Sequence, residues 1–274
     1  MKVIAAYSIK GGVGKTATAV NLAHLAAASR ARTLLWDLDP QGAASYCFRV
    51  KPKVKGGAEK LLRKGVLERR IRATDYAGLD LVPADFSYRH MDLVLEDAKR
   101  GTDRIARRLR SLAGQYDYVF LDCAPSISLV SEAVFAASDA LLVPTVPTTL
   151  SVRMVKRLAK HLRRQGPDVR VLPFFCMVDR RKALHREICS TANEKPFRFL
   201  ESRIPYSSVV ERMSVNRAPL QTFARSCEAA RAYSKLWDEI IARLDRAATT
   251  SRWPTGRTPA PRRPRLRPGP TPDR

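Results

Sequence analysis

The stretch Lys10-Gly11-Gly12-Val13-Gly14-Lys15-Thr16 joins an apolar run at residues 3–7 to an Ala-rich run that begins near Ala17. Glycines leave the backbone of such a turn free of Cβ atoms, so its N–H groups can converge on phosphate oxygens. The positive end of a following helix favours the same anion. A strand, a glycine-rich turn and a helix in this order predict a phosphate-binding loop, and with it a nucleotide site.

The loop departs from the strict pattern G-x-x-x-x-G-K-[ST], because Ile9 takes the position of the first glycine and a second lysine, Lys10, follows it. This arrangement, K-G-G-x-G-K-[ST], resembles the deviant Walker A motif of the ParA/MinD family of ATPases. The resemblance implies that Lys10 crosses the interface of an ATP-sandwiched homodimer to the nucleotide of the partner subunit. Lys15 would reach the β- and γ-phosphates, and Thr16 would hold Mg²⁺. The predicted ATP-binding loop comprises Gly11, Gly12, Val13, Gly14, Lys15, Thr16 and Ala17.

Length and charge narrow the class of protein. The 274 residues suffice for one α/β domain, predicted over residues 1–247, followed by a basic Pro/Arg-rich disordered tail at residues 248–274. The formal net charge of +24 indicates a polyanionic partner, with nucleic acid first. Five scattered cysteines without C-x-x-C spacing favour neither a disulfide framework nor a zinc site, and they suit a reducing cytoplasm. We expect no membrane contact, because no apolar run reaches the length of a bilayer.

Apolar runs alternate with helical patterns along the chain. Predicted strands lie at residues 3–7, 33–38, 79–82, 118–121, 140–143, 171–178 and 197–204. Predicted helices lie at residues 16–28, 91–112, 128–137, 151–164, 184–194 and 228–246. Nearly continuous apolar strands separated by helices predict an α/β fold, a mainly parallel sheet with helices on both faces. Ligands of such sheets bind at the carboxyl ends of the strands.

Two acids, Asp37 and Asp39, stand at the end of the strand predicted at residues 33–38. Asp37 and Asp39 stand before Pro40 and Gly42, which break the strand. This segment resembles the Walker A′ motif of the same family. The resemblance implies that Asp39 orients the attacking water and that Asp37 supports the network of Mg²⁺ and phosphate. An Asp-Pro turn that merely caps the next helix is the alternative.

A further acid, Asp122, ends the apolar strand at residues 118–121. The segment reads as a Walker B motif followed by switch II. Asp122 would hold Mg²⁺ through water, since this ion keeps much of its hydration shell and takes few protein carboxylates. Cys123 follows directly, and a small residue at a tight turn explains it better than a redox role.

Later loops follow strands at positions where the family binds the nucleotide base and ribose. Met177 or Asp179 could read the edge of the adenine, and Pro205, in the segment Ile204-Pro205-Tyr206, could pack near the base. Prolines are common in loops without such a role.

A surplus of cations in the second half of the chain predicts DNA binding. Residues 150–231 contain eighteen Lys and Arg against seven acids, a density that suits contact with the phosphate backbone without sequence preference. No helix-turn-helix or zinc-finger signature indicates base readout. The predicted DNA contacts are Arg180, Arg181, Lys182, Arg186, Arg203, Arg212, Arg217 and Arg225.

The resemblance to ParA-type partition ATPases extends over about residues 2–246. It implies an ATP-dependent dimer that binds nonspecific double-stranded DNA on the nucleoid, and an adaptor on the cargo that stimulates a slow hydrolysis. The cargo stays open: a plasmid, a chromosome, a protein-shelled organelle such as a carboxysome, or a chemotaxis cluster.

Other functions compete with this prediction. A small-molecule ligase or synthetase of the same superfamily is the enzyme alternative, and a DNA-coating scaffold with a degenerate nucleotide site is the non-enzymatic one. A MinD-like membrane ATPase is disfavoured because the tail cannot form an amphipathic helix. Relatives that bind a metal cluster or arsenite need paired cysteines, which are absent from suitable positions, and a tyrosine kinase needs tyrosines beyond Tyr233.

Overall fold

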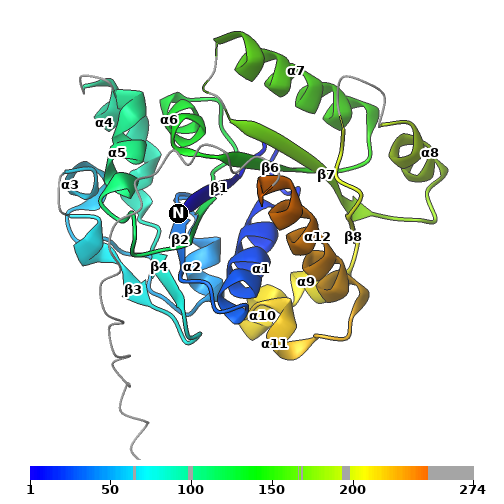
Figure 1. Ribbon diagram of the computed structural model, residues 1–274, viewed down its shortest axis with the longest axis horizontal. Helices are drawn as coiled ribbons and strands as arrows, with labels where there is room; N and C mark the ends of the chain where they lie inside the picture. Colours follow the sequence, from blue (N-terminus) through cyan, green and yellow to red (C-terminus); the bar gives the residue numbers. More distant parts are fainter. Residues whose placement is uncertain (64–65, 98–100, 166, 168, 193–197, 246–274) are drawn as a thin grey trace, which may run out of the picture.

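The computed structural model describes residues 1–63, 66–97, 101–165, 167, 169–192 and 198–245. Within these residues the strands form one eight-stranded sheet in the order β3-β4-β2-β5-β1-β6-β7-β8 (Figure 1). Neighbouring strands run parallel, apart from the antiparallel pair β3 and β4. The strands are β1 (Lys2–Ala6), β2 (Thr33–Asp37), β3 (Arg72–Ala73), β4 (Leu79–Val82), β5 (Tyr118–Asp122), β6 (Ala140–Thr145), β7 (Arg170–Val178) and β8 (Arg203–Pro205).

Helices connect the strands and pack on the sheet. The α-helices of the described residues are α1 (Lys15–Ala28), α2 (Ala43–Cys47), α3 (Gly57–Leu61), α4 (Met91–Glu96), α5 (Arg104–Arg110), α6 (Leu129–Ala137), α7 (Thr149–Gln165), α8 (Ala183–Thr191), α9 (Ser208–Glu211), α10 (Met213–Asn216), α11 (Leu220–Phe223) and α12 (Glu228–Asp245). Short 3₁₀ helices lie at η1 (Glu68–Arg70), η2 (Phe86–His90) and η3 (Gly101–Asp103).

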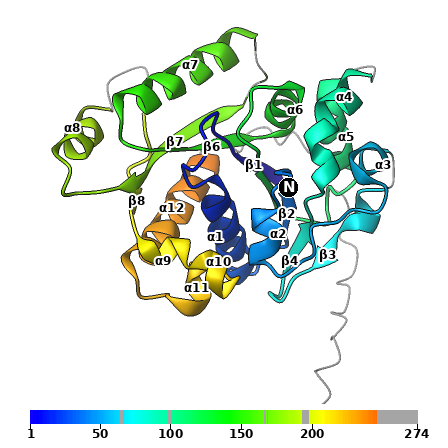
Figure 2. The same ribbon diagram turned by 180° about the vertical axis from the view of Figure 1, so that it is seen from behind.

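The sheet buries both of its faces, as the apolar strands predict. Successive side chains of β1 alternate between two cores: Val3 and Ala5 belong to one, Ile4 and Ala6 to the other. Helices α3 to α8 cover the first core, and α1, α2, α10, α11 and α12 cover the second (Figures 1 and 2). The predicted α/β architecture with helices on both faces is confirmed.

The order of the strands determines where a ligand can bind. Strand β1 lies between β5 and β6, so the connections that leave β1 and β5 run toward opposite edges of the sheet. At such a switch point the loops diverge and leave a crevice at the carboxyl ends of the strands. The loop after β1 and the acids that end β2 and β5 all belong to this edge of the sheet.

Two predictions of secondary structure were wrong in detail, and one short strand was not predicted. The helix predicted at residues 91–112 is divided into α4, η3 and α5. In the described part of the strand predicted at 197–204, strand β8 begins only at Arg203. The two-residue antiparallel strand β3 was not predicted, because two exposed residues carry no apolar pattern. The predicted tail, residues 248–274, lies outside the described residues.

A buried polar contact joins the first helix to the C-terminal half of the chain. The Asn21 side-chain amide donates to the Ala17 carbonyl at 2.7 Å, and its oxygen accepts from the Leu220 backbone N–H at 2.9 Å. Loss of a buried polar partner is costly, so this asparagine fixes α11 against α1. No helix of the described residues is both long and apolar enough to span a bilayer.

Candidate functional site

The glycine-rich loop connects β1 to α1 and leaves the N-terminus of that helix open. Gly12 and Gly14 have φ angles of +69° and +93°, which disfavour any residue with a Cβ atom. Gly14 is the N-cap of α1, and no side chain caps the first turn. The free N–H groups and the positive end of the helix dipole therefore point out of the loop, an arrangement that binds phosphate.

The two left-handed glycines differ in their surroundings, and this difference predicts a result. A Cβ atom on Gly14 would lie 2.9 Å from Cys176 Sγ, whereas a Cβ atom on Gly12 would have nothing within 4 Å. We expect Gly12→Ala to lower the free energy of unfolding by about 1 kcal/mol through backbone strain, and Gly14→Ala by roughly 2–3 kcal/mol. Urea denaturation measures both.

Adding Cys176→Ala to each variant separates the two causes. The sulfur is then absent, so the second substitution should restore part of the stability of Gly14→Ala and none of that of Gly12→Ala. Equal losses for the two glycine variants in the wild-type background would contradict the proposed contact.

The two lysines of the loop have different environments. Lys15 is buried, and its Nζ donates to the Lys10 carbonyl at 3.3 Å. Burial lowers the pKa of Lys15, while the charges of Asp122 and Asp39 raise it. Lys10 is exposed, and its side chain makes no hydrogen bond or ion pair with a described residue. Its backbone N–H donates to Ser8 Oγ at 3.2 Å, and its carbonyl accepts from Lys15. The Lys10 side chain is therefore available to a group outside this chain.

Two carboxylates meet at the ends of neighbouring strands. Asp37 ends β2 and pairs in register with Asp122, which ends β5. Asp37 is satisfied: its Oδ2 accepts from the Ser45 backbone N–H at 2.8 Å and from Ser45 Oγ at 2.7 Å. Burial nevertheless raises the pKa of Asp37 to about 6. No pattern in the sequence indicated Ser45, because this contact forms only when α2 packs over the end of β2.

Asp122 differs from Asp37 in its hydrogen bonding. It is 0% exposed, and neither carboxylate oxygen makes a well-formed hydrogen bond with a described residue, although the Thr16 hydroxyl lies near enough to lower the pKa of Asp122. Burial raises the pKa of Asp122 well above its usual range, and the charge of Asp37 adds to the effect. An unpartnered buried carboxylate is costly, and a divalent cation with oxygen ligands would satisfy it. Thr16 is the second residue of α1 at the same edge and is half-buried, so its hydroxyl fits the same ion.

Asp39 lies just beyond β2, half-buried. Its Oδ1 accepts from the Gln41 backbone N–H at 2.9 Å, and its carbonyl accepts from the Gly42 N–H at 2.9 Å. These contacts form a tight turn that orients the carboxylate. The Asp39 charge raises the pKa values of both Lys15 and Asp122.

The residues predicted to contact the base lie at the other end of the same edge. Met177 has a φ angle of +57° where the register of β7 and β8 shifts, and Pro205 pairs with Val178. Asp179 is already engaged, since its two oxygens accept from the Arg181 guanidinium at 3.0 Å each. These hydrogen bonds lower the pKa of Asp179 to about 2. Reading of an adenine edge by this side chain would require Arg181 to release it.

The residues predicted to contact DNA come from several elements. Arg180, Arg181 and Lys182 lie between β7 and α8 and Arg186 lies in α8, whereas Arg212, Arg217 and Arg225 follow α9, α10 and α11 (Figure 1). Arg203 is exposed on the edge strand β8.

Five of these eight side chains are engaged within the chain. Arg180 pairs with Glu228 at 3.2 Å and Arg181 with Asp179 at 3.0 Å. The guanidinium groups of Arg186 and Arg203 donate to backbone carbonyls. The Arg217 guanidinium lies 4.4 Å from the centre of the Tyr46 ring and donates to the Tyr46 carbonyl. The other three, which have no side-chain partner among the described residues, are Lys182, Arg212 and Arg225.

Comparison with known proteins identifies the family. A model of the AAA domain matches residues 1–167. The chain belongs to this family. It is an ATP-hydrolysing P-loop enzyme of the ParA/MinD type, as the loop predicted.

Several relatives show how far the similarity extends. This ATPase is 38% identical over 147 residues to the chromosome partitioning protein ParA of Myxococcus xanthus. The aligned residues cover 52% of this chain and 51% of that relative. The chain thus spans about half the length of this relative. Apo McdA of Cyanothece has a TM-score of 0.78 at 19% identity and covers 88% of the chain and 99% of its own. Cobyrinic acid a,c-diamide synthase of Mycobacterium smegmatis has a TM-score of 0.74 at 23% identity. The similarity covers 94% of this chain and 99% of the synthase chain.

Proposed function

We propose that the chain is an ATP-dependent, dimerising ATPase that binds DNA without sequence preference and positions or segregates a cargo. The observation that carries this proposal is the exposed, unengaged side chain of Lys10 beside the buried Lys15. A lysine used only within its own site would be held there, whereas Lys10 is free to reach the nucleotide of a second copy. The Myxococcus relative, named as a chromosome partitioning protein, supports the same class of function.

The nucleotide in this proposal is ATP with Mg²⁺. The synthase of M. smegmatis binds an ATP analogue and magnesium, and a complex of ATP with an Asp-to-Ala variant of McdA is known. In this chain the loop from Gly11 to Ala17 and Lys15 would hold the phosphates. Thr16 and Asp122 would hold Mg²⁺, with Asp37 behind them, and Asp39 would orient water. The ion supplies positive charge that neutralises the phosphates.

The cation surplus supports DNA as the partner. A net charge of +24 attracts the phosphate backbone strongly at ordinary ionic strength. DNA binding would place the protein on the nucleoid of the cytoplasm, where an adaptor bound to the cargo stimulates hydrolysis. The cargo can be a plasmid, a chromosome or a protein organelle such as a carboxysome, and a genomic neighbour that encodes the adaptor would distinguish these.

The dimer is tested with Lys10→Ala. A charge-assisted hydrogen bond is worth about 1.5–3 kcal/mol, so its loss across the interface should weaken dimerisation by about 10–100-fold. Nucleotide affinity of the monomer should change little. Sedimentation velocity with Mg²⁺ and a non-hydrolysable ATP analogue measures the dimer. Lys53→Ala, at another exposed lysine, serves as the control, and unchanged dimerisation of Lys10→Ala would disprove the role of Lys10.

The DNA switch is tested with the full chain and a labelled random-sequence duplex. We expect tight binding with the ATP analogue and weak binding with ADP. Equal binding in both nucleotide states would remove the switch from the proposal.

A small-molecule synthetase is the second candidate, and the synthase of M. smegmatis favours it because that structure covers 94% of the chain. At 23% identity this likeness concerns the fold. A synthetase would hydrolyse ATP only with its small substrates, would show no response to DNA, and would tolerate Lys10→Ala without loss.

A further inference from the structure

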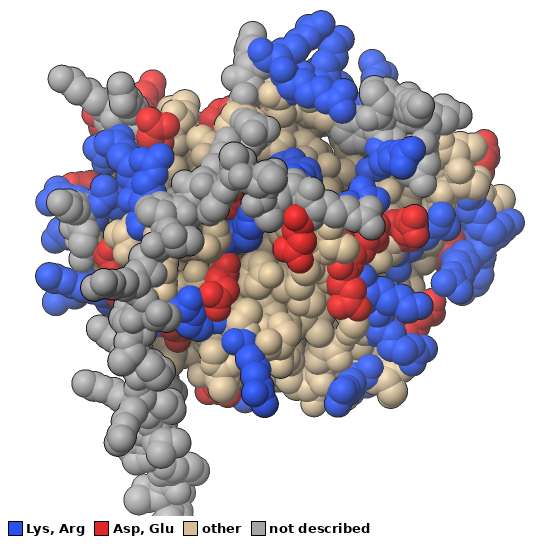
Figure 3. All heavy atoms as spheres, viewed as in Figure 1, with Lys and Arg blue, Asp and Glu red and all other residues tan. Residues whose placement is uncertain are grey.

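Helix α7 presents an unusual concentration of positive charge. Its seventeen residues include six Lys and Arg and no Asp or Glu. In Figure 3 a group of Lys and Arg side chains gathers at the top of the view, where Figure 1 places α7. None of these residues was among the predicted DNA contacts, although residues 151–164 were predicted to form a helix.

One side of helix α7 packs against the first core, and the other side faces solvent. Val155, Leu158 and Leu162 are buried in the first core, so the helix cannot rotate its charges into the protein. Its cations point outward, and five of them make no ion pair or side-chain hydrogen bond with another described residue. These five are Arg153, Lys156, Arg157, Lys160 and Arg164. We call them the α7 row.

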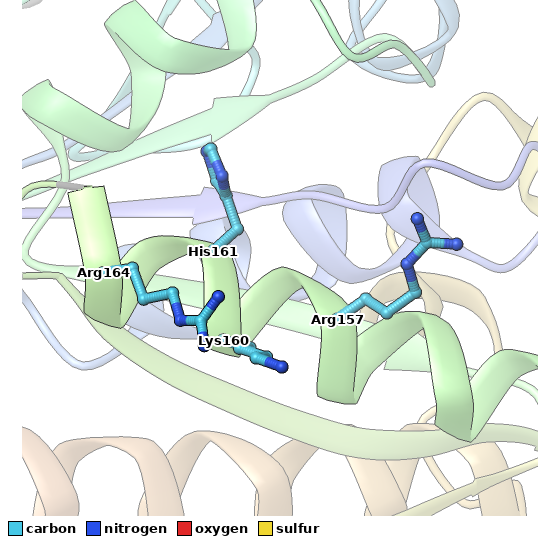
Figure 4. A pocket seen from close by; sticks show the side chains of 4 residues that line it. All are labelled: Arg157, Lys160, His161 and Arg164. Atoms are coloured by element: carbon cyan, nitrogen blue, oxygen red, sulfur yellow. The ribbon is translucent and has the colours of Figure 1, made fainter.

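The hollow beside this helix is lined entirely by α7. It has a volume of about 390 Å³, and its lining residues are Arg157, Lys160, His161 and Arg164 (Figure 4). His161 turns to Glu132 of α6, with Nε2 and Oε1 3.2 Å apart. The other three lining residues carry uncompensated positive charge around a space that an anionic group could enter.

The α7 row costs stability in the free protein. Lys156 and Lys160 are four residues apart, as are Lys160 and Arg164, and like charges at this spacing repel by a few tenths of a kcal/mol per pair. A bound polyanion would relieve this repulsion. The chain therefore carries a surface that an anionic partner stabilises.

The dimensions of the α7 row suit a nucleic-acid backbone. Arg153 and Arg164 are eleven residues apart, or about 16 Å along the helix axis. One strand of duplex DNA presents a phosphate about every 3.4 Å, so this length faces about five phosphates. An acidic protein segment fits less well, because stable protein contacts need aromatic or aliphatic anchors. In the described part of α7 the exposed large apolar side chain is Leu150, at the start of the helix.

We infer that the α7 row is a binding surface for the phosphate backbone of double-stranded DNA. The inference rests on the proposed DNA-binding function and assigns it to α7 rather than to the arginines that the sequence indicated. Five of those are engaged within the chain, whereas the α7 row makes no ion pair or side-chain hydrogen bond with the part of the chain that the structure describes.

The test is the triple variant Arg157→Gln, Lys160→Gln, Arg164→Gln. Glutamine keeps the helix and removes three charges. We expect the affinity for a labelled 24-base-pair random duplex, with Mg²⁺ and a non-hydrolysable ATP analogue, to fall by about 10–100-fold. The plot of log K against log salt should become less steep by about 2.7, or 0.9 for each lost phosphate contact. ATP turnover without DNA should be unchanged.

The matched control is Lys51→Gln, Lys53→Gln, Lys55→Gln, which removes the same charge from three exposed lysines. It should leave the salt dependence close to that of the wild type. Lys160→Glu is an independent second variant and should weaken DNA binding as a single substitution. Equal effects of the two triple variants would overturn the inference.

Two further outcomes separate this inference from the proposed function. A wild-type protein that binds DNA under the control of ATP, with α7 variants indistinguishable from the control, would overturn the role of α7 alone. A wild-type protein without DNA affinity would overturn both. A labelled poly-glutamate peptide is the second probe: loss of its binding in the α7 variant, with DNA binding intact, would assign the surface to an acidic protein instead.

Discussion

Replacing Asp39 by Asn should lower the rate of ATP hydrolysis by about 10²–10⁴-fold, while affinity for Mg²⁺ and ATP changes only a few-fold. The amide oxygen of Asn can still accept from the Gln41 N–H, so the turn after β2 should persist. Only the carboxylate charge is lost, and with it the group that would orient the attacking water. Phosphate release under single turnover measures the rate, and a fluorescent ATP analogue measures binding.

The control for this experiment is the same chemical change at an exposed acid. Asp238 lies exposed on α12, away from the loop, and Asp238→Asn should leave the rate unchanged. If Asp39→Asn hydrolysed ATP at the rate of the control, the assignment of Asp39 would be wrong. Loss of ATP binding together with hydrolysis would instead mean that Asp39 acts in holding the nucleotide.

The phosphate loop and the strand-end acids were predictable because their signals are local. The glycines, Lys15 and Thr16 follow one another in the chain, and Asp37 and Asp122 each end an apolar run. Parallel strands end at the same edge, so the sequence predicted that these acids meet, and the register of β2 and β5 pairs them. The sequence could not show that the two acids differ in their hydrogen bonds. Ser45 donates two hydrogen bonds to Asp37, whereas neither oxygen of Asp122 makes a well-formed hydrogen bond with a described residue.

The division of the helix predicted at residues 91–112 also has a local cause that the pattern did not indicate. A Cβ atom on Gly101 would lie 2.0 Å from the Leu95 carbonyl oxygen, so the chain passes the end of α4 where only glycine fits. The apolar periodicity continues on both sides of this residue and hides the interruption.

The sequence does not show which of the predicted DNA contacts have tertiary partners. Arg180 meets Glu228, 48 positions later, and Arg217 stacks on Tyr46 from the first third of the chain. A count of charges along the sequence gives the surplus but not which cations are paired. The cations of the α7 row differ from the predicted contacts in their tertiary neighbours, which the sequence does not show.

Asp122→Asn should raise the melting temperature of the metal-free protein and remove its stabilisation by Mg²⁺ and ATP. The Asp122 carboxylate is fully buried, and among the described residues only the Thr16 hydroxyl lies near enough to offset the cost of its charged form. Its pKa is raised on folding, which means that stability falls as pH rises through the folded-state pKa, and a neutral amide avoids this loss. We expect a gain of about 1–3 kcal/mol, or about 3–10 °C, near neutral pH.

Asp37→Asn is the matched control, since it makes the same change at the neighbouring strand end. Asp37 accepts two hydrogen bonds from Ser45 through one oxygen, and an amide that turned its nitrogen toward Ser45 would break them. This variant should therefore gain less stability than Asp122→Asn, or lose some. Melting curves in EDTA and in Mg²⁺ with ATP compare the two. If Asp122→Asn melted below the wild type in EDTA, or kept its stabilisation by Mg²⁺ and ATP, Asp122 would not be the cation ligand, and the buried charge would have another partner.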